Sequence, residues 1–266
     1  ALLSASLSDA AFTAWGWRVA FLLSAVLVAF GLWIRLRLEE TPVFKQIAER
    51  GERSSAPVNE VFGRERRALF AGILARVCPD VLYSLFTVFT LTYITNELDM
   101  SRGQGSAAVM IGSACQLLLM PAFGALSDRM NRRRLYLYGT IAAAVWPFVF
   151  FPMISGGSFL LLVLGIVVAL VIHAVLYGPQ AALITEQFSP RLRYTGSSLA
   201  YTLAGVIGGA PAPLILTALL AAFGSWWILA VYIVFTAVLT GIGLVLARDP
   251  VVESEEEPTV SEAVTP

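Results

Sequence analysis

Seven long apolar runs, separated by short charged clusters, are the feature that most restricts the fold of this chain. Each run is long enough to cross a bilayer, since about 20 apolar residues in a helix span the hydrocarbon core. Charged residues make up 14% of the sequence and are gathered between the runs. The sequence therefore predicts an all-α membrane protein with seven transmembrane helices, at residues 18–36, 69–95, 106–126, 135–154, 159–186, 196–220 and 225–246.

The positions of Lys and Arg predict which ends of these helices are cytoplasmic. One set of connections holds fourteen of these residues, whereas the opposite set holds only Arg102. Cytoplasmic connections carry the excess of positive charge, so we expect the basic set inside: residues 37–67, 127–134, 187–195 and the tail from 247. This orientation describes a multi-pass protein of the plasma (inner) membrane, in contact with lipid, with residues 1–17 external and the C-terminus cytoplasmic.

Other classes of protein fit the sequence less well. Seven spans with an external N-terminus also fit a receptor, but a chain that opens without a signal peptide is easier to explain if further spans precede it. Cys78 and Cys115 lie inside apolar runs, which argues against a disulfide framework or a metal site. One His and no paired acids in the spans argue against an intramembrane enzyme. We therefore expect no catalytic residues, no cofactor and no nucleic-acid partner.

A charged turn between the third and fourth spans, at residues 124–134, is the most distinctive local sequence. It places Asp128 at the carboxyl end of a helix, where a negative charge meets the negative pole of the helix dipole. We therefore expect the Asp128 carboxylate to serve a neighbouring helix N-terminus or an arginine. A basic loop that only sets topology is the alternative interpretation.

The spacing of this turn, G-x-L-x-D-R-x-N-R-R, resembles the cytoplasmic loop signature of the major facilitator superfamily. Asn131 stands where that family has Gly. We expect Asn131 to adopt a left-handed turn conformation, since Asn tolerates it better than most residues. The stretch from Glu186 to Gly196 resembles the acidic-Pro-Arg-Gly motif at the matching loop of the same superfamily.

The first span resembles one branch of that superfamily in particular. Its opening, Trp15-Gly-Trp-Arg18, and the stretch from Ile34 to Phe44 are similar to the sixth helix and following loop of the metabolite:proton symporters. That branch includes transporters for osmoprotectants, shikimate, citrate and 2-oxoglutarate. Thr41 followed by Pro42 predicts a helix N-terminus, and hence a surface helix that continues to about Arg53.

The resemblance implies helices six to twelve of a twelve-helix symporter that couples protons to a small polar metabolite, such as an organic acid or a betaine. Such a chain is expected to be a fragment whose partners are the metabolite, protons and the N-terminal helical half that it lacks. An inactive structural remnant is the alternative. The implied parts are an external segment with the last helix of the N-terminal half (1–36), a cytoplasmic inter-half loop with a surface helix (37–67), a C-terminal six-helix bundle (68–246) and a disordered acidic tail (247–266).

The second span carries a charged pair within the hydrocarbon region. Arg76 and Asp80 are four residues apart and so share one helix face, which Tyr83 roughly continues. Charges at this depth usually face a partner or a wet cavity, because exposure to lipid costs a few kcal/mol. Pro79 is expected to loosen or bend the helix between them. The alternative is an internally neutralised pair that only fixes packing.

The fifth span carries a second polar stripe, interrupted by Gly178 and Pro179, which are expected to break the helix. Its histidine is either a proton carrier or a neutral hydrogen-bonding group. As the first helices of two repeated triplets, spans two and five should face one central cavity. The expected substrate- and proton-binding residues are Arg76, Asp80, Tyr83, His173, Tyr177 and Gln180.

The remaining spans carry fewer signals. The fourth is expected to contribute no ionisable group to the core and therefore to be peripheral and lipid-facing. The seventh is expected to lack polar features. Gly205 and Gly209 in the sixth span form a small-xxx-small face that should let another helix approach closely.

The charged loops predict a cytoplasmic gate. We expect Asp128 to pair with Arg193 or with the helix start at Gly196, and Glu186 to pair with Arg132 or Arg133. The expected gate residues are Asp128, Arg129, Arg132, Arg133, Glu186 and Arg193.

Overall fold

The computed structural model describes residues 8, 11–37 and 56–247. Among these residues, seven helical spans are long and apolar enough to cross a membrane, which confirms the predicted fold class. Five are single helices: α3 (Trp17–Arg37), α8 (Arg102–Arg129), α9 (Arg132–Ile154), α10 (Phe159–Thr185) and α13 (Trp227–Leu246). The predicted helix at 42–53 and the acidic tail from 248 lie outside the described residues.

The second and sixth spans are each interrupted by one π-helical turn. The second consists of α6 (Arg66–Ser84), η2 (Leu85–Phe89) and α7 (Thr90–Glu97). The sixth consists of α11 (Arg193–Ala204), η3 (Gly205–Gly209) and α12 (Ala212–Phe223). Single π-helical turns inside long helices are frequently found at functional sites.

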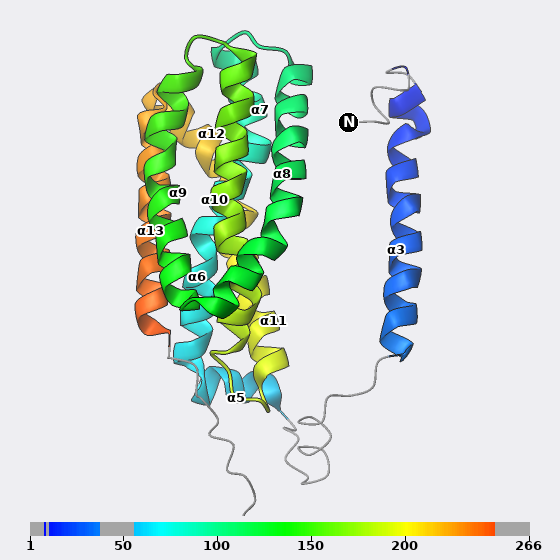
Figure 1. The fold of residues 1–266 in the computed structure, drawn as a ribbon, viewed down its shortest axis with the longest axis vertical. Coiled ribbons are helices and arrows are strands. Elements are labelled where there is room, and N and C mark those ends of the chain that lie inside the picture. Colours follow the sequence, from blue (N-terminus) through cyan, green and yellow to red (C-terminus); the bar gives the residue numbers. More distant parts are fainter. Residues whose placement is uncertain (1–7, 9–10, 38–55, 248–266) are drawn as a thin grey trace, which may run out of the picture.

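The helix α6 lies at the centre of a bundle. It packs against α13, α11 and α10, and α10 packs in turn against α8 and α9. A short helix, α5 (Pro57–Arg64), lies across one end of the bundle next to α11 (Figure 1). By contrast α3, which follows the π-helical turn η1 (Phe12–Gly16), stands apart from the bundle (Figure 1). None of the residues in its apolar stretch is buried against another helix.

The prolines within α6 and α10 do not break these helices. Both run continuously, through Pro79 and through Pro179, so the break expected at Gly178-Pro179 is wrong. A proline leaves the carbonyl four residues earlier without its usual donor. In α6 this is the Ala75 carbonyl, and hydroxyls from two other helices lie close to it, Tyr136 at 2.9 Å and Thr240 at 3.3 Å.

These two hydroxyls correct two further expectations. Tyr136 of α9 is fully buried, so the fourth span contributes an ionisable side chain to the core and is not merely lipid-facing. Thr240 of α13 is also fully buried, and it accepts a hydrogen bond from the Cys78 amide at 3.1 Å. The seventh span therefore has a polar side chain, and this side chain lies beside the backbone groups of α6 next to Pro79.

Close approach between α8 and α10 depends on Gly178. A Cβ atom on this residue would lie 2.9 Å from the Gly124 nitrogen, 2.9 Å from the Met120 oxygen and 3.2 Å from the Phe123 carbonyl carbon. All three are backbone atoms of α8, which cannot move aside as a side chain can. A Cβ on Gly124 would meet only the Gly178 oxygen, at 3.6 Å, which is an ordinary contact.

The small residues in η3 approach α6 differently from the expected small-xxx-small face. Gly208 lies against Val77, and Gly209 lies against Asp80, whereas a Cβ on Gly205 would meet nothing within 4 Å. The π-helical turn accounts for the difference, because its hydrogen bond runs from the Ala210 amide to the Gly205 carbonyl, five residues back. A π-helical turn holds one residue more than an α-helical turn, so Gly205 and Gly209 no longer lie on the same face of the sixth span.

Asn131 does not adopt the expected left-handed conformation. Its φ is −64° and its ψ is 111°, which is extended backbone, and its side chain accepts a hydrogen bond from the Arg134 amide at 3.1 Å. Asn is among the best N-cap residues, and an N-cap residue normally has this backbone conformation. The tight turn between α8 and α9 is therefore held by the start of α9.

Candidate functional site

A cavity of about 540 Å³ opens among α6, α8, α10 and η3. The residues that line it lie within a few positions of the middle of their spans, which are Arg66–Glu97, Arg102–Arg129, Phe159–Thr185 and Arg193–Phe223. This places the cavity near the mid-depth of a bilayer. Its polar lining residues are Arg76, Asp80, Tyr83, Ser84, Gln116, His173 and Tyr177.

One wall of the cavity is an ion pair. The Arg76 Nε donates to Asp80 Oδ1 at 3.1 Å, and Arg76 Nη1 donates to the Tyr201 carbonyl at 2.9 Å. The guanidinium carbon also lies 4.3 Å from the centre of the Tyr201 ring, within range of a cation–π interaction. Arg76 keeps 18% of its side chain exposed at the cavity, whereas Asp80 keeps 10%.

The second carboxylate oxygen of Asp80 has no hydrogen-bond donor within the described structure. It is buried against the backbone of η3, where a Cβ on Gly209 would lie 3.4 Å from it. Burying a charged oxygen without a donor is unfavourable. The pair is therefore well satisfied at Oδ1 and poorly satisfied at Oδ2.

A second part of the cavity lining is aromatic. The His173 ring is stacked on Tyr177 at 5.2 Å between ring centres, and Tyr83 lies on it at 5.0 Å with a tilt of 44°. The Nδ1 atom of His173 is hydrogen-bonded to the side-chain amide of Gln116 in α8. Tyr83 and Tyr177 are partly exposed to the cavity, while His173 between them is almost fully buried.

The structure thus gathers five of the six predicted binding residues around one cavity. Gln180 is the exception, because it is fully buried and does not line the cavity. Its side chain faces Tyr136, whose hydroxyl lies 3.1 Å from the Gln180 Oε1 atom.

The sequence analysis missed Tyr136 and Tyr201. Each is a tyrosine in an otherwise apolar stretch, and that is a usable signal, because a hydroxyl inside a membrane protein needs a partner. The Tyr136 hydroxyl meets Gln180, which is 44 residues away along the chain, and the Tyr201 backbone carbonyl accepts from Arg76, which is 125 residues away. Within the described ranges, no three His, Cys, Asp or Glu side chains are grouped so that they could hold a metal ion.

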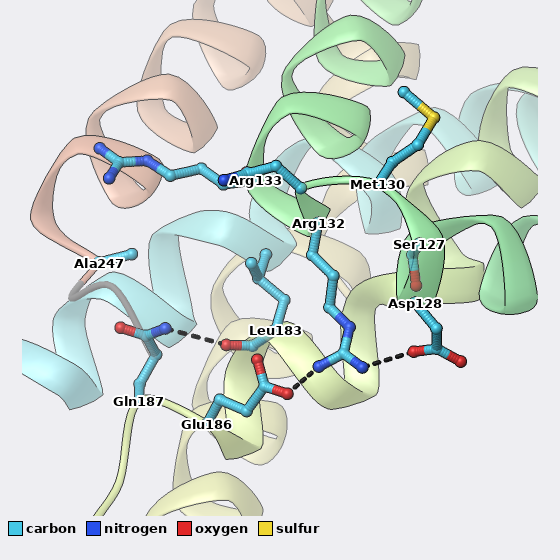
Figure 2. Close-up of a pocket in the computed structure, with 10 residues that line it drawn as sticks. Ser127, Asp128, Met130, Arg132, Arg133, Leu183, Glu186, Gln187 and Ala247 are labelled. Atoms are coloured by element: carbon cyan, nitrogen blue, oxygen red, sulfur yellow. Dashed lines mark hydrogen bonds and ion pairs between the residues drawn. The ribbon is translucent and has the colours of Figure 1, made fainter. Parts of the chain in front are cut away.

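A second charged cluster lies where α8, α9 and α10 meet at one end of the bundle. Arg132 of α9 pairs with Asp128 of α8 and also with Glu186, which follows α10 (Figure 2). Each charge opposes the dipole of its own helix, since the two acids stand at carboxyl ends and Arg132 stands at an amino end. The three together compensate one another, and they line a small cavity of about 240 Å³.

The predicted pair between Glu186 and Arg132 is present, but the predicted partner of Asp128 is wrong. Asp128 pairs with Arg132, and no ion pair joins it to Arg193 in the described structure. Arg193 instead stands exposed at the first position of α11. The Arg133 side chain points away from Arg132 (Figure 2), and Arg129 is exposed at the end of α8.

Comparison with known proteins identifies relatives. Residues 80–266 match the family model of the Major Facilitator Superfamily. The chain is 31% identical over 252 residues to the shikimate transporter of Escherichia coli (strain K12), an alignment that covers 93% of this chain and 58% of that protein. It is 30% identical over 253 residues to the inner membrane metabolite transport protein YhjE of the same organism, covering 93% of this chain and 57% of that protein.

A third relative is more distant. The chain is 29% identical over 220 residues to the proline/betaine transporter of Escherichia coli (strain K12), covering 78% of this chain and 43% of that protein. The chain therefore spans little more than half the length of the curated relatives that it matches. No solved structure matches. The family model covers most of the chain, including the charged turn and every residue that lines the cavity except Arg76, and on this basis the chain belongs to the Major Facilitator Superfamily.

Proposed function

We propose that this chain forms the C-terminal half, with one preceding helix, of a proton-coupled symporter for a small polar metabolite. The observation that carries the proposal is the mid-depth cavity that is lined by an arginine–aspartate pair and by aromatic side chains. Binding at mid-depth between two halves is what alternating access requires. Because the relatives are longer than this chain, we propose that a second helical half faces the cavity in the complete transporter.

In this proposal Arg76 binds an anionic group of the metabolite. Two of its donors serve Asp80 and Tyr201, and its exposed fraction leaves the rest of the guanidinium for a ligand in the cavity. Tyr83 and Tyr177 provide aromatic faces for a ring or a methylated ammonium group. His173 holds these two rings, and Gln180 supports the site from behind the cavity wall.

Asp80 is the proposed proton site. A metabolite carboxylate that approaches Arg76 competes with Asp80 for the guanidinium, and Asp80 then loses charge compensation. Since its Oδ2 atom already lacks a donor, a proton on Asp80 relieves the burial of an uncompensated charge. Binding of an anion and uptake of a proton are therefore linked through the same ion pair.

The substrate class follows from this chemistry together with the relatives. One is named for shikimate and another for proline and betaine, all of which carry a carboxylate. We therefore propose a small carboxylate, either an organic acid or a betaine-like zwitterion. The test is uptake of radiolabelled shikimate, proline and glycine betaine into vesicles that contain the complete transporter. One of them should accumulate when the outside is made acidic, and a collapsed pH gradient should stop it; no accumulation of any of the three would count against the proposal.

We also propose that the Arg132 end of the bundle is cytoplasmic. Met130 and Gly156 flank α9 at its two ends, and both are exposed. In a chain with Cys78 and Cys115 replaced by Ala, a cysteine at Gly156 should react with an impermeant maleimide in intact cells. A cysteine at Met130 should react only after the cells are opened. The reverse pattern would show that the orientation is inverted.

The cluster of Arg132 with Asp128 and Glu186 is the proposed cytoplasmic gate, and its role can be measured at Ser127. Ser127 lines the same small cavity as the cluster and is 3% exposed. A single cysteine is introduced by Ser127→Cys into the chain that lacks Cys78 and Cys115. Adding Arg132→Ala should then increase the rate at which this new thiol is alkylated from the cytoplasmic side about tenfold. This is the value of a partly buried ion pair that contributes about 1.4 kcal/mol.

The matched control is Arg134→Ala, which removes an exposed arginine from the same helical turn. It should leave the alkylation rate unchanged. Glu186→Gln should speed alkylation more than Asp128→Asn, because Asp128 keeps 63% of its side chain exposed and Glu186 only 31%. Equal alkylation rates in all of these variants would contradict the proposal that this cluster is a gate.

A further inference from the structure

The loop between α10 and α11, residues 186–192, is attached to the rest of the bundle near both of its ends. At its start Glu186 pairs with Arg132 of α9 (Figure 2), in the cluster proposed as a gate. Near its other end the Arg191 Nη2 atom donates to Glu60 Oε1 of α5 at 3.0 Å. The loop therefore connects the Arg132 cluster with α5.

A second polar contact joins the loop to α5. Glu65 lies at the corner where α5 leads into α6, and its Oε1 atom accepts from the Ser189 hydroxyl at 2.5 Å and from the Ser189 amide at 3.4 Å. The other carboxylate oxygen of Glu65 is buried without a hydrogen-bond donor in the described structure. Hydrogen bonds to an ionised acceptor are stronger than those between neutral groups. Glu60 and Glu65 therefore hold the same loop, at Arg191 and at Ser189.

Apolar packing and backbone hydrogen bonds fix the shape of this loop. Phe188 and Leu192 are both buried, in one cluster with Val61 of α5, which is fully buried. The Phe188 amide donates to the Thr185 carbonyl at 3.3 Å, and the Leu192 amide donates to the Ser189 carbonyl at 3.0 Å. Closely packed segments transmit displacement, because they have little free volume in which to deform. A shift of α5 should therefore reach the start of the loop.

The contact at the start of the loop is the less exposed of the two ion pairs that Arg132 makes. Glu186 keeps 31% of its side chain exposed, whereas Asp128 keeps 63%. Because solvent screens an exposed pair more strongly, the pair with Glu186 contributes more to holding the cluster together. The loop therefore acts on the stronger of the two contacts.

We propose that the loop at residues 186–192 couples α5 to the Arg132 cluster, so that the position of α5 controls the cytoplasmic gate. The bundle begins at α5, which follows α3 in the described chain. In the proposed transporter α3 belongs to the other helical half, so a movement of that half acts on α5 first. Displacement of α5 then draws Glu186 away from Arg132 and opens the cluster.

The effect on opening rests on the proposed function of the Arg132 cluster as a gate. The mechanical coupling between α5 and that cluster does not. The two parts are therefore tested separately, first by hydrogen exchange without a substrate and then by cysteine alkylation.

The first experiment measures amide hydrogen exchange of the complete chain in detergent by mass spectrometry of its peptides. Coupling between two sites is reciprocal, so breaking the Arg132 cluster should loosen α5. Arg132→Ala should increase the exchange rate of the amides in residues 57–64 about threefold. Arg134→Ala removes an exposed arginine from the same turn and should leave that rate unchanged. Peptides from the opposite end of α9 should exchange equally in all variants, which excludes general unfolding. Unchanged exchange of α5 in Arg132→Ala would overturn the coupling.

The second experiment measures the alkylation rate of the cysteine introduced by Ser127→Cys. Arg191→Gln should increase this rate about threefold, because it removes an ion pair between partly exposed side chains that holds the loop on α5. The matched control is Arg64→Gln, which removes an exposed arginine of α5 and should leave the rate unchanged. Equal rates in Arg191→Gln and in the unmodified protein would overturn control of the gate by α5.

The double variant of Arg132→Ala with Arg191→Gln shows whether the two arginines act in one chain of contacts. In the Arg132→Ala background Arg191→Gln should add no further acceleration, because Glu186 has already lost the partner on which the loop acts. Accelerations that multiply in the double variant would overturn the coupling. No acceleration by Arg132→Ala alone would instead count against the proposed gate, and the exchange experiment would still decide whether α5 and the cluster are coupled.

Discussion

Replacing Arg76 by Ala should abolish uptake of the proposed carboxylate substrate by the complete transporter, with affinity reduced at least about 100-fold. Removing one partner of a desolvated charge pair costs about 2–5 kcal/mol, because the other charge is left without compensation. Arg76→Lys should keep part of the affinity, since the positive charge remains. The affinity of Arg76→Lys should still be lower than that of the unmodified protein, because an ammonium cannot bind Asp80, the Tyr201 carbonyl and a ligand with the planar geometry of a guanidinium.

The control for this prediction concerns Asp80, which is left buried and unpaired in Arg76→Ala. The double variant Arg76→Ala with Asp80→Asn removes that uncompensated charge and should recover stability without recovering uptake. Size-exclusion chromatography would report the folded fraction, and vesicle uptake would report transport. Normal uptake in a folded Arg76→Ala protein would mean that the ion pair only fixes the packing of α6.

Replacing Gly178 by Ala should prevent the bundle from folding stably. The added Cβ would lie about 3 Å from three backbone atoms of α8, so the two helices would have to separate. Overpacking of this kind typically costs 1–3 kcal/mol, and rigid backbone neighbours favour the upper end of that range. We expect either loss of the folded species or an unfolding midpoint lowered by more than about 5 °C.

The matched control is Gly124→Ala, on the facing helix and in the charged-turn motif itself. Its Cβ would meet one atom at 3.6 Å, and Ala is the better helix former by about 1 kcal/mol. This variant should fold as well as the unmodified chain. If Gly178→Ala folded equally well, the described contact between α8 and α10 would be incorrect.

The sequence alone determined the spans, because a helix that crosses a bilayer must be apolar over a fixed length. The ends of α9, α10 and α13 lie within three residues of their predicted positions. It also determined the ion pair of Arg76 with Asp80, since side chains four apart in a helix always share a face. The pair of Arg132 with Glu186 could be expected for a similar reason: opposite charges at the same membrane face have few other partners.

Only the tertiary structure decided how the helices are rotated about their own axes. In water a helix has an apolar face that must turn inward, but in lipid the outside is as apolar as the inside, and packing alone chooses the face. No local pattern could therefore show that Gln180 lies behind the cavity wall while Tyr177, three residues before it, lines it. The same holds for Tyr136 and Thr240, whose hydroxyls meet a carbonyl of α6 that is more than 60 residues away in the chain, and for Asp128, whose partner was decided by the position of α9.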